Sequence, residues 1–425
     1  MMEQLAAKVE QELEKHFKHV DHIVEENQQK VLRAFQTHKV SDSHFNPTTG
    51  YGYDDFGRDV LEQVYATVFG GEDALVRPQI VSGTHAITTA LFGILRPGDE
   101  LLYITGKPYD TLEEVIGCRG GDNRDNGSLK DFHIGFDAIP LTDAGTVNWD
   151  QIRKNISKNT KIIGIQRSKG YANRPSFTIE QMKEMVRFVK NIDPNLIVFV
   201  DNCYGEFVEK DEPLNIGADL IAGSLIKNPG GGITRAGGYI VGKKDYIRQC
   251  ANRLTAPGLG KETGANLGLL QEMFQGLFLA PHIVGQALKG AILSSKLLKE
   301  LGFQTSPAPD ERRTDLIQSV NFATSEQMIA FCQAIQEASP VNSYVKPHPS
   351  SMPGYESEVI MAAGTFVQGA SIELTADGPI RPPYTVFVQG GLTYAHVKIA
   401  MIAALQRLQE QGLVPLTNNT DETEQ

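Results

Sequence analysis

The first 40 residues carry hydrophobic side chains at the spacing of an amphipathic helix. These positions lie four or seven residues apart, with charged residues between them: Leu5, Val9, Leu13, Val20, Val24, Val31 and Phe35. We expect either a helix packed on the body of the protein or an arm that reaches a second subunit. The segment 41–57 is rich in Gly, Asp and aromatic residues and predicts a loop, with a helix to follow over 58–69.

Short apolar runs then alternate with helical patterns as far as residue 200. The expected strands are 74–81, 101–105, 161–166 and 196–200, and the expected helices are 85–95, one from about 111, and 179–191. This alternation is typical of an α/β fold with a mostly parallel sheet and crossover helices. The run 196–200 is apolar on both faces, as a central parallel strand should be.

The pattern changes after about residue 285. We expect a long helix over 285–301, strands at 316–322, 366–374 and 384–388, and helices at 325–338 and 396–411. These elements predict a smaller α+β C-terminal domain. The expected organisation is therefore an N-terminal helix and arm at 1–50, a large domain at 51–285, a small domain at 286–416 and a polar tail at 417–425.

Composition narrows the function classes. The chain has 425 residues, of which 41% are hydrophobic, and 40 basic against 51 acidic residues give a net charge of −11. This balance disfavours a broad nucleic-acid or anionic-membrane surface. Four scattered cysteines without a CxxC pair predict no structural zinc and a reducing compartment. We expect no metal site, no secretory signal and no apolar stretch of about 18 residues, and therefore a cytoplasmic protein.

Two motifs place a reactive side chain after an apolar run. The run IVFVDN ends in Asp201, at the strand end where ligands of open α/β sheets bind, although a capping or turn aspartate is as common. In GSLIKNPGGG, Lys227 follows two apolar residues and precedes glycines that let the backbone approach a ligand closely. This setting suits a Schiff-base amine, whereas a lone lysine at a turn is more often a surface residue.

Two further motifs could bind a flat, phosphorylated ligand. In VSGTHA, Ser82, Gly83 and Thr84 stand at a strand-to-helix junction, where helix N–H groups attract an anion; a simple Ser/Thr cap is the alternative. Tyr109, just past another strand, could stack on an aromatic ring. The four motifs together are the parts that a pyridoxal phosphate (PLP) enzyme requires. Proton transfer by Lys227 would then require a lowered pKa.

The sequence resembles the fold-type I PLP-dependent, transferase-like enzymes, and within them the cystathionine/methionine gamma-lyase group and its branch named for aluminium resistance. The resemblance is carried over about 50–245 by GYGYDDFGRDVLEQVYATVFGGEDALVRPQIVSGTHAI, IQRSKGYANRPS, VDNCYGEFVE and GSLIKNPGGGITRAGGYIVG. It implies PLP as cofactor. The cofactor-binding residues that it implies are Ser82, Gly83, Thr84, Tyr109, Asp201, Ser224 and Lys227, with Lys227 and Tyr109 also catalytic.

The same resemblance implies an active site shared between subunits. A tyrosine of the group reaches into the neighbour's site, which suggests Tyr51 or Tyr53 here, in a homodimer or homotetramer. The arginine of the group's Tyr-x-Arg motif is absent, and Arg58 is a candidate substitute. For the substrate carboxylate, Arg381 is the nearest candidate and Arg174 its rival.

One other departure concerns the residue before the lysine. The usual threonine is Ile226, which removes one phosphate-binding hydroxyl. The reaction that the resemblance implies is α,γ- or α,β-elimination from a sulfur-containing amino acid such as methionine. An aminotransferase or aldolase uses the same four parts, and a PLP-binding stress or metal-tolerance protein with little turnover is a further alternative. A dinucleotide-binding Rossmann enzyme is disfavoured, because no GxGxxG follows the first strand.

Overall fold

The structure is a computed structural model that describes residues 2–118, 126–172, 174–352 and 357–414, so the predicted tail lies outside the described residues. The chain divides into two compact units. Residues 23–282 form the large unit, and residues 1–22 together with 283–425 form the small unit. The sequence-based limits at residues 50, 285 and 416 stay a prediction about domains.

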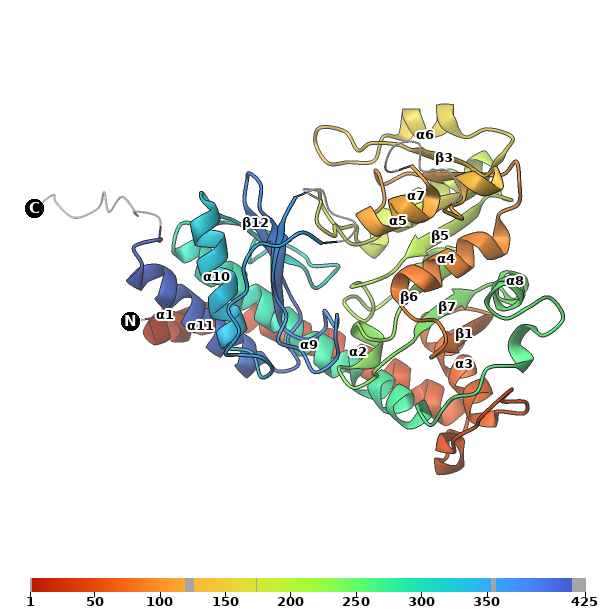
Figure 1. The fold of residues 1–425 in the computed structure, drawn as a ribbon, viewed down its shortest axis with the longest axis horizontal. Helices are drawn as coiled ribbons and strands as arrows, with labels where there is room; N and C mark the ends of the chain where they lie inside the picture. Colours follow the sequence, from red (N-terminus) through yellow and green to blue (C-terminus); the bar gives the residue numbers. More distant parts are fainter. Residues whose placement is uncertain (1, 119–125, 173, 353–356, 415–425) are drawn as a thin grey trace, which may run out of the picture. The chain divides into compact units, whose positions relative to one another are not determined.

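The large unit is built on a seven-stranded sheet in the order β1-β7-β6-β5-β4-β2-β3 (Figure 1). Its strands are β1 (Asp73–Arg77), β2 (Glu100–Tyr103), β3 (Gly135–Ala138), β4 (Thr160–Gln166), β5 (Ile197–Asp201), β6 (Leu220–Ser224) and β7 (Gly238–Gly242). Strand β7 is antiparallel to both of its neighbours, while all other neighbours pair in parallel. This confirms the predicted α/β class with a mostly parallel sheet.

Helices of the large unit accompany this sheet, and the second to the fifth of them connect successive strands. They are α3 (Phe56–Phe69), α4 (Gly83–Ile94), α5 (Asp110–Ile116), α6 (Trp149–Asn155), α7 (Ile179–Ile192) and α8 (Lys244–Leu254). Residues of α4 and α8 join one core cluster with alternate residues of β5, Ile197 and Phe199. Each such side chain contributes about 1.5–3 kcal/mol by leaving water. This burial fixes the register of β5, and with it the position of the residue that ends the strand.

The small unit contains a five-stranded antiparallel sheet in the order β10-β11-β12-β9-β8. Its strands are β8 (Gln304–Ser306), β9 (Gln318–Asn321), β10 (Val359–Ala362), β11 (Thr375–Pro379) and β12 (Thr385–Gln389). Its helices are α1 (Met2–Glu12), α10 (Ser325–Glu337) and α11 (Tyr394–Glu410). Helices α2 (Glu14–Thr37) and α9 (Leu270–Glu300) contribute residues to both units.

Two sequence-based expectations for this part of the chain are wrong. The predicted strand at 366–374 is a series of turns, because the carboxylate of Glu373 accepts the backbone N–H groups of Phe366 and Val367 at 2.8 and 2.9 Å and folds the segment back. The predicted helix at 285–301 begins at Leu270. It continues through Pro281, a residue that usually interrupts a helix because it lacks a backbone donor.

The early start of α9 also corrects the expectation about apolar stretches. Among the described residues, α9 is the one helix long and apolar enough to cross a membrane by length and composition. In this structure 67% of its most apolar 18-residue window is buried inside the protein.

Candidate functional site

Asp201 ends the central strand β5, which is buried along its whole length. The side chain is 5% exposed, and the backbone N–H of Cys203 donates to Oδ1 at 3.2 Å. Burial raises the pKa of Asp201, while the positive charge of Lys227 opposes this rise. The sheet register places Asp201 beside Gln166, the last residue of β4. A buried carboxylate therefore stands at the carboxyl edge of the sheet.

Lys227 follows β6 and directly precedes a short 3₁₀ helix, η4 (Asn228–Gly230). Gly230 is required there, because a Cβ at this position would lie 1.7 Å from the carbonyl oxygen of Leu225. The Nζ atom of Lys227 lies 4.0 Å from the centre of the Tyr204 ring.

Burial lowers the pKa of the Lys227 amine, but Cys203, Tyr204 and Asp201 favour its charged form and together raise the pKa above its ordinary value. The lowering expected from the sequence depends on a cationic cofactor ring as well as on burial, so it stays a prediction.

The turn before α4 lies against this cluster. The side-chain oxygen of Ser82 accepts a hydrogen bond from the backbone N–H of His85 at 3.0 Å and so caps the helix. A Cβ on Gly83 would lie 3.3 Å from the sulfur of Cys203 and 3.3 Å from the Cβ of Ser224. A side chain at this position would require its neighbours to move by a few tenths of an ångström, so glycine favours this close approach. The helix N-terminus, the end of β6 and the loop after β5 therefore meet at one place.

Tyr109 connects the same turn to strand β4. Its hydroxyl shares a 2.8 Å hydrogen bond with Oγ1 of Thr84, and its backbone N–H donates to Oε1 of Gln166 at 2.8 Å. Burial, and then the charge of Asp201, raise the pKa of Tyr109, so the hydroxyl keeps its proton at neutral pH. The structure thus brings together every predicted cofactor-binding residue, although the roles of these residues stay predictions.

The predicted partner-subunit residues lie on an exposed loop of the large unit. The rings of Tyr51 and Tyr53 stack with their centres 5.3 Å apart, and the two side chains are 70% and 55% exposed. Arg58 is buried nearby, and its NH1 group donates to the carbonyl oxygens of Gly52 and Gly264 at 2.7 and 3.3 Å. This guanidinium therefore supports the tyrosine loop.

The two candidate arginines for the substrate carboxylate belong to different units. Arg381 lies in the small unit, exposed, between β11 and β12. Arg174 lies in the large unit, where its NH2 group donates to the carbonyl oxygens of Gln166 and Ser168 at 3.2 and 2.6 Å. Its charge also acts to lower the pKa of Asp201, which places Arg174 in the electrostatic environment of the site.

Sequence reasoning missed three residues of the loop after β5: Cys203, Tyr204 and Glu206. Glu206 is fully buried and accepts a hydrogen bond from the Tyr239 hydroxyl at 2.7 Å. Burial raises the pKa of Glu206 to about 8, and that of the Cys203 thiol well above its ordinary value. The available signal was their position in VDNCYGEFVE, immediately after the strand-end Asp201.

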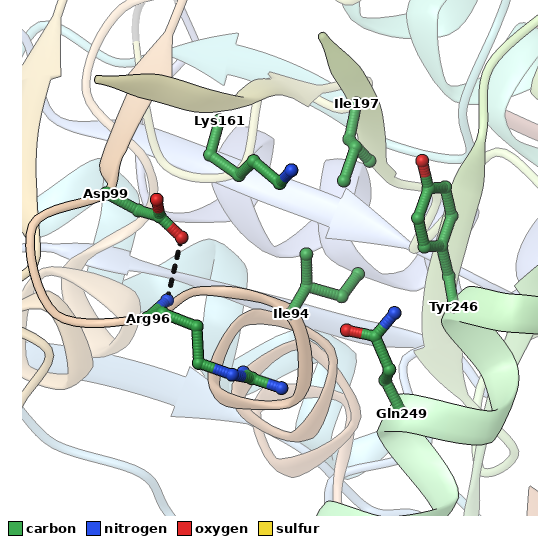
Figure 2. Close-up of a pocket in the computed structure, with 7 residues that line it drawn as sticks. All are labelled: Ile94, Arg96, Asp99, Lys161, Ile197, Tyr246 and Gln249. Atoms are coloured by element: carbon green, nitrogen blue, oxygen red, sulfur yellow. Dashed lines mark hydrogen bonds between the residues drawn. The ribbon is translucent and has the colours of Figure 1, made fainter. Parts of the chain in front are cut away.

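A separate cavity of about 340 Å³ lies at the opposite edge of the sheet (Figure 2). Lys161 and Ile197 line it from the amino ends of β4 and β5, whereas Gln166 and Asp201 stand at the carboxyl ends of the same strands. This cavity is therefore distinct from the site described above. In the ranges that the structure describes, no group of three or more His, Cys, Asp or Glu side chains could hold a metal ion.

The residues at the carboxyl edge fit PLP. Lys227 offers an amine. Asp201 offers a buried carboxylate that accepts hydrogen bonds from the backbone N–H and the side chain of Cys203, and its further lone pairs can accept one from a protonated pyridine nitrogen. The capped turn at Ser82–Thr84 begins a 12-residue helix and can receive a phosphate. The approach of Gly83 to Ser224 forms a cradle that a Cβ would narrow.

Comparison with known proteins agrees with this fit. The family model described as methionine gamma-lyase matches residues 2–409. A Bacillus subtilis relative, the uncharacterized protein YnbB, is 62% identical over 97% of this chain and 98% of its own length. The solved structure of a carbon-sulfur lyase involved in aluminum resistance from Clostridium novyi matches with a TM-score of 0.92 and 49% identity, over 96% of each chain.

A more distant structure shows the same fold. The PLP-dependent protein YhfS from Escherichia coli matches with a TM-score of 0.60 at 16% identity, over 91% of this chain and 97% of its own. The expected fold-type I architecture is thereby confirmed. The chain belongs to the methionine gamma-lyase family, and its cofactor is pyridoxal phosphate.

Proposed function

We propose that the protein is a PLP-dependent carbon–sulfur lyase that releases a thiol from a sulfur-containing amino acid by α,γ- or α,β-elimination. The observation that carries this proposal is the convergence of the Lys227 amine and the Asp201 carboxylate at one edge of the sheet, where each shifts the pKa of the other. The match to the methionine gamma-lyase family over most of the chain supports it.

Lys227 and Asp201 hold the cofactor from two sides in this proposal. When bound, PLP supplies an electron sink for the charge that develops at the substrate α-carbon. The Nζ atom of Lys227 would be the attachment point, and once released this amine would take the α-proton and move protons between substrate carbons. The Asp201 carboxylate holds the proton of the ring nitrogen. Ser224 and the turn Ser82–Thr84 bind the phosphate. The residue before the lysine adds no hydroxyl to this site, because it is Ile226 and not a threonine.

Tyr109 is the proposed acid for the departing sulfur. Its hydroxyl is held by Thr84 and keeps its proton at neutral pH, so it can donate to a thiolate. A ring fixed at both its hydroxyl and its backbone N–H is also suited to stack on the cofactor.

Substrate recognition and assembly complete the proposal. Arg381 or Arg174 binds the substrate carboxylate as a planar, bidentate donor. The exposed pair of Tyr51 and Tyr53 reaches the site of a second copy of the chain, in a homodimer or homotetramer. We place this enzyme in the cytoplasm, and its partner is a small amino acid.

Product analysis tests the reaction type. Purified protein is incubated with methionine, cystathionine or cysteine, and thiol and 2-oxoacid are measured together. Elimination predicts equal amounts of both, and their loss in Lys227→Ala. The matched control is Lys243→Ala, which changes an exposed lysine on a remote part of the large unit. Amino-group transfer without thiol release, or no product from any of the three substrates, would contradict the proposal.

A further inference from the structure

The loop after β5 contains two residues with an unfavourable backbone. Tyr204 has φ 71° and Phe207 has φ 63°, both in the left-handed region. For bulky side chains this region is strained, because Cβ crowds the following carbonyl. Such residues persist only where their surroundings fix them, and they gather at functional sites.

A buried hydrogen-bond network holds the loop on both sides of Tyr204. Arg167 NH1 donates to Oδ1 of Asn202 at 2.9 Å, and Nδ2 of Asn202 donates to Oε2 of Glu212 at 3.0 Å. The other oxygen of Glu212 accepts the Phe207 N–H at 2.9 Å. Asn27, from helix α2, donates to the Phe207 carbonyl at 3.1 Å. The backbone of Tyr204 is therefore constrained from residue 202 to residue 207.

This constraint turns the aromatic ring of Tyr204 toward the lysine. The Nζ atom of Lys227 lies 4.0 Å from the ring centre, well within the range in which an ammonium is attracted to an aromatic face. The attraction is stronger in a site with little water. In the part of the chain that the structure describes, Tyr204 thus combines a strained backbone with direct contact to the proposed attachment amine.

We propose that Tyr204 is a positioning residue whose ring holds the ammonium form of Lys227 whenever this amine is not bonded to the cofactor. The inference rests on the proposed function, which makes Lys227 the attachment point. Holding the ammonium ion fixes the position of the amine while it is not bonded to the cofactor. It also lowers the fraction of unprotonated amine available to react with the cofactor aldehyde.

Other ionisable groups also act on Lys227, and the test must separate them from the ring. They are the Tyr204 hydroxyl, with Asp201, Cys203 and Glu206 from β5 and its loop, and Tyr109 from the start of α5. Replacing the Tyr204 ring leaves Asp201 unchanged. The net charge of the site at neutral pH therefore also stays the same.

The test follows attachment of PLP to the full chain after the cofactor has been removed. The rate at which borohydride-trapped label accumulates on Lys227 is measured against pH, because only the unprotonated amine attacks the aldehyde. In Tyr204→Leu we expect the midpoint of this profile to fall by about one pH unit and the rate below the midpoint to rise about tenfold. Tyr204→Phe keeps the aromatic face and removes only the hydroxyl, which also favours the charged amine, so its midpoint should fall clearly less than that of Tyr204→Leu.

Two further variants control for misfolding and for the loss of an aromatic ring elsewhere in the protein. Tyr204→Gly removes the ring and relieves the left-handed backbone, so it should show the same shift as Tyr204→Leu. Tyr246→Leu removes a ring that faces Lys243 at 6.0 Å at the other edge of the sheet, and should change nothing.

The outcomes are distinct. Profiles of Tyr204→Leu and Tyr204→Gly that overlap with the unchanged protein would overturn the inference, as would a Tyr204→Phe profile shifted as far as that of Tyr204→Leu. An unchanged protein that attaches no label at Lys227 would overturn the proposed function, and this inference with it.

Discussion

Burial changes the protonation of several side chains around Lys227. Cys203 and Glu206 have raised pKa values because they have left water, whereas the amine of Lys227 stays charged because its neighbours favour the ammonium form. At the scale of single residues, Asp201 is therefore the carboxylate available to a ring nitrogen, and Tyr109 is a protonated acid beside it.

The first residue-scale prediction concerns Asp201. Asp201→Asn keeps the shape of the side chain and removes its charge, so a protonated ring nitrogen would lose the carboxylate that stabilises it. We expect kcat/KM for elimination to fall on the order of 100-fold or more. Steady-state kinetics measure this loss, with Asp245→Asn, an exposed residue of α8, as the control. Near-normal kcat/KM in Asp201→Asn would show that this carboxylate is not the nitrogen's partner.

The second concerns the pH dependence of stability at Glu206. Its folded pKa, about 8, lies above the ordinary value of 4.5, so the folded protein holds an extra proton between these values. The free energy of unfolding therefore falls as pH rises from about 5 to 8, on the order of a few kcal/mol. Urea unfolding should show a smaller fall in Glu206→Gln, and the full fall in Glu184→Gln, an exposed control. Equal falls in all three proteins would contradict the burial of an extra proton here.

At the scale of elements, the ends of two strands and the start of one helix lie together at the site. Strand β5 delivers Asp201, the end of β6 delivers Ser224 shortly before Lys227, and α4 begins with its cap at Ser82. Gly83 allows these segments to approach within van der Waals contact. The site is therefore a property of element ends, which burial of the strand interiors fixes in register.

This arrangement predicts that removing the cap of α4 lowers both the stability of the protein and its affinity for PLP. Ser82→Ala removes the oxygen that accepts the His85 N–H, and should lower the free energy of unfolding by about 1 kcal/mol. Thr324→Ala removes an equivalent cap from α10, in the small unit, at a similar cost. Only Ser82→Ala should also weaken PLP binding, which titration of the visible absorption band measures. Equal PLP affinity in both variants would argue against a phosphate at this turn.

The sequence predicted the elements that a hydrophobic pattern specifies. Strand β5 and helices α4 and α7 lie within a few residues of their expected limits, and the strand-end Asp201 and the turn at Ser82 followed from them. In the large unit, strands β3, β6 and β7 were not predicted, and the last three residues of β6, Ala222, Gly223 and Ser224, carry little β-propensity.

The side-chain environment of the site could not be predicted from the sequence to the same extent. Tyr204, Glu206 and the raised pKa of Lys227 depend on which side chains the tertiary structure brings together, and no spacing in the sequence reports this.

At the scale of the whole molecule, the proposed active site requires a second copy of the chain. The stacked rings of Tyr51 and Tyr53 are exposed, although exposed aromatic side chains cost free energy in water. Their carrier loop is nevertheless held in place, since Arg58 donates to the carbonyl of Gly52 and Gly264 N–H donates to the Tyr51 carbonyl at 2.9 Å. A fixed loop with exposed rings is suited to a symmetric contact.

Complementation tests this shared site. Lys227→Ala chains lack the amine, and chains with Tyr51→Ala and Tyr53→Ala lack the rings, so each homodimer should be inactive. Refolded mixtures should regain about a quarter of normal elimination activity, because half of the dimers are mixed and each of these has one intact site. No recovery in a mixture shown to contain mixed dimers would contradict sharing.

The central claim is that Lys227 is the point at which the cofactor is attached. The most direct measurement is borohydride reduction of the purified protein with PLP, followed by peptide mass spectrometry. We predict one phosphopyridoxyl group per chain, on the peptide that contains Lys227. A label on another lysine, or a protein that takes up no PLP, would contradict the account.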